Sequence, residues 1–350
     1  MLIRVDLATF PLGKTLAKDL YSSDGRLLMP RGIILKEFHL QQLLQRGYEH
    51  IFVLEDESSS SNSGSSSKNE DTRLPEVFSN TVENIRDMMA AVSAGHMVKP
   101  SEVNESIDIL LPEVTGTNNV MKHLLNLRNK DEYTLQHSVS VGVMSIKIGQ
   151  AMKLSDKQLK NLGIAGLLHD IGKCKIPIEI INKPGPLNEE EFKEIQNHPI
   201  YGYRIVNDIK LPDPDISTAV LQHHEHQDGH GYPLKAKGKD ITLFANIIAV
   251  ADVFDALTSD RAYRPKMPLL KAIDHIVKST LGHLEPMVAR RLFTYILDIS
   301  IGETVLLNNG EKATVVLINE LDPTRPLVRI GDKFIDLKTE KDIFIQDLLT

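Results

Sequence analysis

The sequence contains only one cysteine, Cys174, among its 350 residues. A single cysteine excludes an intramolecular disulfide and a cluster of thiolate ligands within one chain. Long apolar runs are also missing, because the richest stretch, LFANIIAVADVF, is shorter than a membrane span and contains Asn246 and Asp252. The N-terminus places Arg4 and Asp6 where a signal peptide has its apolar segment. We therefore expect a cytoplasmic protein with no membrane partner.

An excess of positive charge is absent as well. The formal net charge is −7, from 40 Lys and Arg against 47 Asp and Glu. No nucleic-acid polymer is therefore expected as a partner, although a local basic pocket can still bind a phosphodiester. The 41% hydrophobic and 25% charged residues are ordinary for a globular protein, and 350 residues are enough for two or three domains.

The first part of the chain predicts a small module and a linker. Residues 1–56 mix short apolar alternations with turn signals and one helical pattern, which Gly47 would end before a strand at 50–54. Residues 57–72 are rich in serine and have almost no apolar side chain, so they predict a flexible linker. A small α+β module is expected before this linker, with docking, dimerisation or regulation as its role.

The rest of the chain predicts a mainly α protein. Residues 73–300 have an apolar period near 3.6, interrupted by Pro and Gly, which indicates a domain of at least seven helices. Residues 301–350 change to alternating patterns around Asn309-Gly310 and Gly331-Asp332, which predict two hairpins. We therefore expect an all-helical core domain followed by a small β-rich extension.

Seven of the 13 histidines lie between positions 137 and 230, inside the predicted helical domain. His137 has Val141, Met144 and Ile148 as its neighbours at i+4, i+7 and i+11, so its side chain is expected to face the core. A histidine on such a face is most often a hydrogen-bonded core residue. His137 alone therefore indicates no function.

Other candidates stand at predicted helix ends or on apolar helices. His169 and Asp170 end one small apolar helix just before Gly172, and His198 closes a helix opened by Asn188 as its N-cap. The next helix ends in two more histidines, and the following, almost wholly apolar helix contains a carboxylate that needs a partner when buried. These last candidates are His223, His224 and Asp252.

Each of these residues has a plain structural explanation, but together they supply five imidazoles and two carboxylates in one domain. That set is what two divalent metals need, with iron, manganese, cobalt, nickel and zinc all compatible with nitrogen and oxygen ligands. A bridging carboxylate such as Asp170 can hold two metals about 3.5–4 Å apart, the usual separation for phosphoester hydrolysis. Lys173, Arg261 and Arg264 are cations suited to phosphate, although exposed Lys and Arg are common on any surface.

Four spaced motifs, HDIGK, NKPGPLNEEEFKEIQNH, HHEHQDGHGYP and ADVFDALTSDRAYR, resemble the HD-GYP family of bacterial phosphodiesterases. The resemblance covers residues 131–264 closely. It implies an all-α HD-type core whose metal cluster, most often iron and then manganese, hydrolyses cyclic di-GMP to linear pGpG or to GMP. The metal ligands that it implies are His137, His169, Asp170, His198, His223, His224 and Asp252.

The resemblance also implies roles around the metals. Asp170 and Lys173 are expected to be catalytic, with Lys173 on the phosphate. The expected substrate-binding set is Lys173, Arg261, Arg264, Asp255 and Tyr232, with Asp255 orienting nearby groups and Tyr232 in the Gly-Tyr-Pro turn beside the pocket. His226 and His230 are not needed for the ligand set and are expected to lie outside it.

One departure from the family bears on the number of metals. Members with three metals have a Glu four residues before the first histidine, where this chain has Tyr133. Glu132 is one residue out of phase, which is about 100° around a helix. We therefore expect two metals rather than three.

These expectations lead to one mechanism and two rival functions. In the mechanism, a dinuclear centre binds a phosphate oxygen, metal-bound hydroxide attacks phosphorus in line, and Lys173 stabilises the developing charge. The first rival is a receptor that binds a cyclic dinucleotide without hydrolysis and relays the signal through its N-terminal module or a partner. Besides cyclic di-GMP, the partners considered are a second copy of the chain, as a homodimer, and a signalling protein. The second is a phosphohydrolase for another cyclic dinucleotide or a nucleotide. The motifs do not choose the bases, the metal or the group that protonates the leaving oxygen.

Overall fold

The computed structural model of the chain describes residues 2–6, 16, 20–21, 27–29, 33, 35, 39, 43, 50–54, 70–117, 120–121, 124, 133–259, 267, 269–298, 301–319 and 325–349. The chain divides into two compact units, residues 1–66 and 67–350, and each is considered by itself. Among the described residues, no helix is long and apolar enough to cross a membrane.

The first unit contains two small antiparallel pairs of strands. β1 (Leu2–Asp6) pairs with β4 (His50–Leu54), and β2 (Leu20–Tyr21) pairs with β3 (Leu27–Met29). The strand predicted at 50–54 is therefore present. Most of the helix predicted before Gly47 lies outside the described residues.

The predicted linker ends earlier than expected. Residues 57–69 lie outside the described residues, but 70–72 already belong to a helix that begins at Glu70. Acidic residues such as Glu70 and Asp71 favour a helix N-terminus because they interact with the positive end of its dipole.

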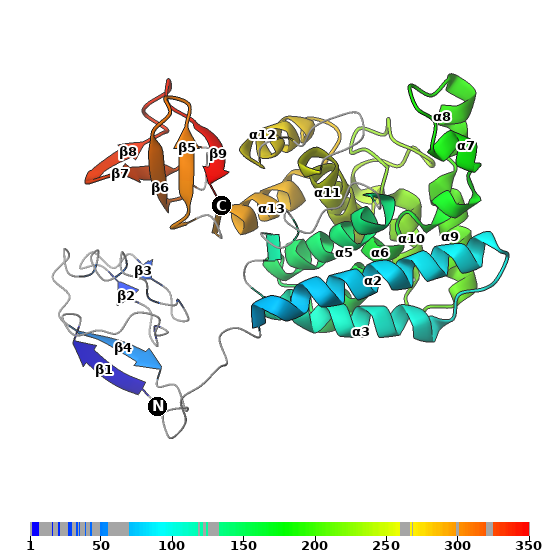
Figure 1. The fold of residues 1–350 in the computed structure, drawn as a ribbon, viewed down its shortest axis with the longest axis horizontal. Coiled ribbons are helices and arrows are strands. Elements are labelled where there is room, and N and C mark those ends of the chain that lie inside the picture. Colours follow the sequence, from blue (N-terminus) through cyan, green and yellow to red (C-terminus); the bar gives the residue numbers. More distant parts are fainter. Residues whose placement is uncertain are drawn as a thin grey trace. The chain divides into compact units, whose positions relative to one another are not determined.

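The second unit begins with a helical body, and the predicted mainly α class is confirmed (Figure 1). Its elements are α2 (Glu70–Ser93), α3 (Pro100–Gly116), α5 (Tyr133–Ala151), α6 (Asp156–Leu168), the 3-10 helix η3 (Ile171–Lys175), α7 (Ile178–Ile181), α8 (Glu189–Ile195), α9 (His198–Ile209), α10 (Pro214–Gln222), the 3-10 helix η4 (Gly238–Asp240), α11 (Leu243–Thr258), α12 (Leu269–Ser279) and α13 (Pro286–Asp298).

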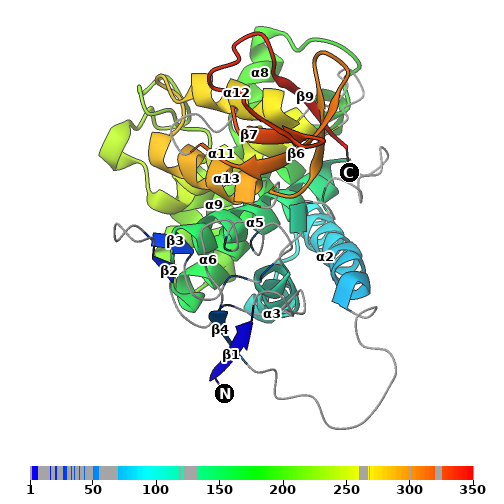
Figure 2. The same ribbon diagram turned by 90° about the vertical axis from the view of Figure 1, so that its left-hand side faces the viewer.

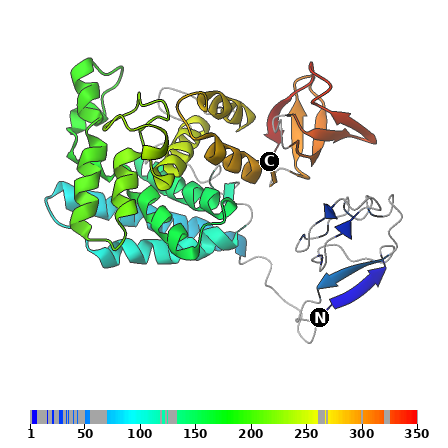
Figure 3. The same cartoon turned by 180° about the vertical axis from the view of Figure 1, so that it is seen from behind.

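Helices α5 and α11 form the centre of this body, because their sequences are apolar on almost every side. α5 packs against α6, α11 and α13, while α2 and α3 lie side by side and cover α5 and α6 (Figures 1 and 3). The α5 and α6 backbones touch where they cross, since a Cβ added to Gly166 would lie 2.7 Å from the Cα of Gly142. This close crossing brings the end of α6 next to the histidine-bearing face of α5.

Two predicted helix ends differ from the structure. Asn188 caps α8 as predicted, with its side chain 2.8 Å from the amide of Glu191. His198, however, begins α9 instead of closing α8, because Pro199 lacks an amide proton to continue a helix but fits the first turn of a new one.

The helix expected to stop at Gly172 ends four residues earlier, at Leu168, and the chain then forms η3. Gly172 has a different purpose there. A Cβ at this position would lie 2.0 Å from the carbonyl oxygen of His198, so only glycine lets η3 approach the start of α9 so closely.

The β-rich extension is a five-stranded antiparallel sheet in the order β8-β7-β6-β5-β9 (Figure 1; β6, β7 and β9 are also labelled in Figure 2). Its strands are β5 (Thr304–Leu307), β6 (Lys312–Leu317), β7 (Leu327–Ile330), β8 (Lys333–Asp336) and β9 (Ile345–Leu349). Both predicted hairpins are present, and Gly310 and Gly331 turn with positive φ of 85° and 56°. The edge strand β9 pairs with β5, and no local sequence pattern predicted this pairing.

Candidate metal centre

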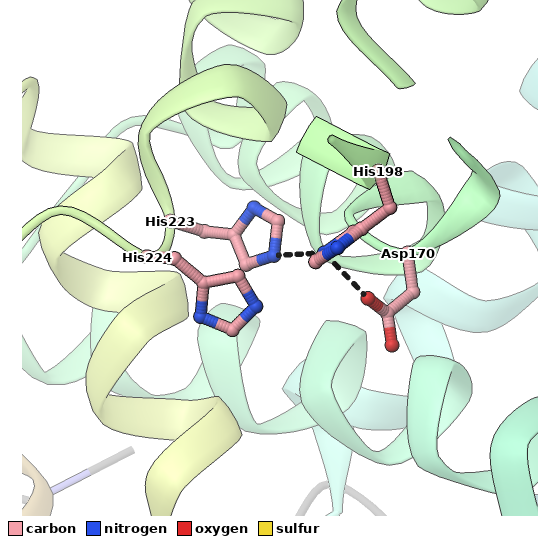
Figure 4. Close-up of side chains that lie close together, drawn as sticks. All are labelled: Asp170, His198, His223 and His224. Atoms are coloured by element: carbon pink, nitrogen blue, oxygen red, sulfur yellow. Dashed lines mark hydrogen bonds and ion pairs between the residues drawn. The ribbon is translucent and has the colours of Figure 1, made fainter. Parts of the chain in front are cut away.

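The structure brings the seven predicted ligand residues together as two groups. The first group is Asp170, His198, His223 and His224, and the second group is His137, His169 and Asp252. Within each group, one nitrogen or oxygen atom of every residue lies within 4.8 Å of those of the others. Figure 4 shows the first group, with His198 between Asp170 and the two adjacent histidines.

Three of the histidines lie at helix ends. His169 follows the last residue of α6, His223 follows the last residue of α10, and His198 comes three residues after the end of α8. The last carbonyl groups of a helix have no partner within the helix. Helix C-termini also carry partial negative charge, which favours a nearby cation.

These three histidines use the free carbonyls in the same way. The Nδ1 atom of each lies 2.7 Å from the carbonyl oxygen three residues earlier, at Gly166 for His169, Ile195 for His198 and Val220 for His223. A carbonyl can only accept, so Nδ1 carries the proton and donates. The Nε2 lone pair is then left to face the cluster, as a metal ligand requires.

His137 is held differently, because it lies inside α5. Its Nδ1 atom is 2.7 Å from Oδ2 of Asp255, and its Nε2 atom is 3.2 Å from Oδ1 of Asp252. Both carboxylates belong to α11, three residues apart and therefore on the same face of that helix. The imidazole thus lies between two carboxylates of one helical turn.

Asp170 contacts residues of both groups. Its Oδ1 lies 3.3 Å from Nε2 of His198, and its Oδ2 lies 3.5 Å from Nε2 of His169 and 3.8 Å from Nε2 of His137. The short approach of η3 to α9 at Gly172 makes this position possible. Asp170 therefore lies between the two groups of candidate ligands.

The electrostatics differ between the groups. Burial, together with the neighbouring histidines, lowers the pKa of His223 well below its usual value and that of His224 to about 3, so both imidazoles are neutral at pH 7. Burial alone would lower the pKa of His137 too, but Asp252 and Asp255 outweigh it and raise that pKa to about 10. A positive charge is therefore favoured on His137, between Asp252 of the second group and Asp255 behind it.

The buried polar atoms fit a metal. Within the part of the chain that the structure describes, Nε2 of His169 and Oδ1 of Asp170 are buried without a hydrogen-bond partner. Such atoms are costly unless a further group satisfies them. Burial would raise the pKa of Asp170, but Lys173 and the adjacent histidines hold it well below its usual range, so the carboxylate is charged. His223, His224 and Asp170 therefore have the protonation states that divalent metals bind, whereas His137 would lose a proton to a metal bound at its Nε2.

Two of the predicted substrate contacts lie beside the cluster. Nζ of Lys173 is 2.5 Å from Oδ2 of Asp170, and its side chain is 27% exposed, so it can also face a ligand in solvent. The ring of Tyr232 stacks on that of His224, with centroids 4.8 Å apart and an angle of 30°. Arg261 and Arg264 lie outside the described residues.

The other residues singled out from the sequence lie as follows. Asp255, expected among the substrate contacts, is buried behind His137, and its Oδ2 also accepts a hydrogen bond from Ser259 at 3.2 Å. His226 stacks on His283, and His230 is exposed beside Asp228. Neither His226 nor His230 belongs to the two ligand groups among the described residues.

Sequence reasoning missed the groups that orient the ligands. The carbonyl groups that hold the three helix-end histidines have no signal in the sequence, because every residue has a carbonyl. Glu225 was also missed: it is buried, accepts a hydrogen bond from the amide of Leu234 at 2.6 Å, and so holds the loop that carries Tyr232. Its only signal was a carboxylate directly after two ligand histidines.

Residues 119–288 match the family model described as the HD domain. This part of the chain is therefore similar to HD domains. The fold of an HDG"Y"P protein from Bdellovibrio bacteriovorus agrees, with a TM-score of 0.55 over 83% of this chain and 98% of that chain at 18% identity. A likeness at this identity shows a common fold, and it extends beyond the HD domain itself.

Curated relatives match parts of this chain. A cyclic di-GMP phosphodiesterase of Pseudomonas aeruginosa is 34% identical over 222 residues, which are 63% of this chain and 53% of the relative. A 3′3′-cGAMP-specific phosphodiesterase of Vibrio cholerae is 40% identical over 144 residues, which are 41% of this chain and 31% of the relative. The matched part of this chain therefore spans about half of the first relative's length and less of the second's. The resemblance to the HD-GYP family predicted from the sequence is confirmed.

Proposed function

We propose that this chain is a metal-dependent phosphodiesterase that hydrolyses cyclic di-GMP to pGpG, to GMP or to both. The observation that carries the proposal is the cluster of seven buried or half-buried ligands in two groups, with Asp170 of the first group in contact with residues of the second. The identity to a cyclic di-GMP phosphodiesterase over the HD domain supports the substrate.

The first group would hold one divalent metal and the second group another, with Asp170 between them. Iron is the first choice and manganese the second. Such a pair supplies a Lewis acid for a phosphoryl oxygen and lowers the pKa of water. The position one helical turn before His137 is Tyr133, where α5 begins, and it gives no carboxylate for a third metal.

The protein groups around the cluster would bind and orient the phosphodiester. Lys173 presents an ammonium group next to Asp170, so it can donate to a phosphate oxygen as negative charge develops there. Tyr232 stacks on His224 and so lies beside the first group. Arg261 and Arg264 are proposed to bind the second phosphate or the bases of the substrate.

The test is a product assay on the full chain purified without oxygen, with its metal content measured. We expect cyclic di-GMP to be recovered as linear pGpG or GMP, and the same preparation treated with a chelator to leave it cyclic. Recovery of cyclic nucleotide that is bound but intact would replace the enzyme with a receptor.

A second substrate is favoured by one comparison, the 40% identity to a phosphodiesterase specific for 3′3′-cGAMP. Hydrolysis rates for cyclic di-GMP and 3′3′-cGAMP, measured separately and in competition, decide between the two. A value of kcat/KM higher for 3′3′-cGAMP would move the proposed substrate to the mixed dinucleotide without changing the metal chemistry.

A further inference from the structure

The anchoring of His137 is unlike that of His169, His198 and His223. At helix ends, a free carbonyl three residues earlier fixes the imidazole. Inside α5, the carbonyls of the preceding turn accept the helix's own amide protons. A histidine in that position needs an acceptor from another element, and α11 supplies it through Asp255.

Asp255 is itself fixed in place. Its side chain is 1% exposed, and Ser259, one turn later on α11, donates a hydrogen bond to the same Oδ2 that lies 2.7 Å from Nδ1 of His137. Asp252, the ligand of the second group, lies one turn earlier on the same face. One stretch of α11 therefore provides a candidate metal ligand and also orients a second ligand on α5.

The chemistry of such a contact is specific. A carboxylate that accepts the Nδ1 proton fixes the imidazole tautomer and orientation and makes Nε2 a stronger donor to a metal. The other histidine of the second group, His169, keeps its own anchor at Gly166. The histidines of the first group make no such contact with Asp255 among the interactions described for them.

We infer that Asp255 is a positioning residue of the metal centre, on which the affinity of the second group for its metal depends and that of the first group does not. The inference rests on the proposed metal-dependent function. It departs from the expectation that Asp255 contacts the substrate, because its carboxylate lies behind His137.

The experiment measures binding of Mn²⁺ alone to the full chain, by competition with a chelator, for wild type, Asp255→Ala and Asp255→Asn. We expect wild type to bind two equivalents. In Asp255→Ala one equivalent should weaken about 10–100-fold while the other keeps its affinity. Asp255→Asn keeps an oxygen that can accept from Nδ1, so its loss should be smaller than that of the alanine variant.

A matched control is Asp213→Ala, which removes a carboxylate at the opposite end of α10 from His223, where it accepts a hydrogen bond from Asn161 at 2.6 Å and caps the helix. This variant should bind both equivalents like wild type. Unchanged Mn²⁺ binding in Asp255→Ala, or equal weakening of both equivalents, would overturn the inference. If the alanine variant does not fold, Asp255→Asn decides. Unchanged Mn²⁺ binding in that variant, together with unchanged hydrolysis rates at all Mn²⁺ concentrations, leaves no role for the Asp255 carboxylate.

The two proposals fail separately. Wild-type protein that binds two Mn²⁺ ions but leaves cyclic di-GMP intact contradicts the proposed function, and the binding comparison of the Asp255 variants is still valid. Wild-type hydrolysis with normal metal binding in the Asp255 variants contradicts only the positioning role.

Discussion

His169, His198 and His223 lie at or just beyond helix ends, whereas His137 lies inside helix α5, and the two locations anchor the imidazole differently. A backbone carbonyl fixes each of the first three, and a carboxylate from another helix fixes the fourth. A carbonyl anchor is part of the helix backbone, so a side-chain substitution that leaves the helix intact also leaves the anchor intact. A carboxylate anchor depends on one residue and on the packing of α5 against α11.

The largest effect is expected at Asp170, the residue that contacts ligands held in both ways. Asp170→Ala should remove both metals and all measurable turnover, a loss beyond the about 100-fold that supporting residues cause. Metal analysis and the product assay check this together. A variant that retains two metals or wild-type turnover would contradict the shared position of Asp170.

Lys173 should affect neither kind of anchor. Lys173→Ala is expected to keep both metals and lower kcat about 10²–10³-fold, the usual cost of one donor to developing negative charge. Lys175→Ala is the control, since that lysine donates to the carbonyl of Val92 instead. If Lys173→Ala loses metal and its rate falls only in proportion to the metal lost, Lys173 would belong to the ligand set and not to the substrate contacts.

The carboxylate anchor should also be visible in the metal-free protein. The pKa of His137 is raised from 6.5 to about 10, so its ion pairs stabilise the fold fully below pH 6.5, and this contribution is lost as the pH rises through 10. The difference in the free energy of unfolding between wild type and Asp255→Asn should therefore be largest near pH 6 and shrink toward pH 10.

Urea denaturation of the chelated proteins between these pH values measures that difference. The contribution of Lys147 to the free energy of unfolding changes with pH in the opposite direction. Burial lowers the pKa of Lys147 to about 8, so its contribution to stability rises with pH from there up to the ordinary lysine pKa. Both proteins contain Lys147, so its contribution cancels in the difference. A difference that grows with pH would contradict the pairing of His137 with Asp255.

The smallest effect is expected from a change in α8, the helix whose last carbonyl anchors His198. Asn188 caps the N-terminus of α8, and the carbonyl anchor at Ile195 is at the other end. Asn188→Ala should cost about 1 kcal/mol of stability without changing metal content. Thermal unfolding checks the stability of this variant, and metal analysis of the same samples checks its metal content. A lost metal equivalent would show that the carbonyl anchor depends on the cap.

The sequence by itself determined the helical domain, the hairpins at Gly310 and Gly331, and the residues of the cluster. These have local causes: apolar period, turn residues, and histidines and carboxylates in positions where each alone would be costly or unexplained. It also placed three histidines near helix ends, although His198 begins a helix instead of closing one. Spaced motifs then indicated the family, because several of them had to match in order.

Only the tertiary structure decided how the ligands are divided and held. The pairing of Asp255 with His137 joins residues 118 positions apart, and no local pattern encodes a contact between two separate helices. The carbonyl acceptors are likewise invisible, since every residue offers one and only the helix ends leave it free. The close contact of Gly172 with His198 has the same origin, because distance between two backbones is a property of packing and not of either segment.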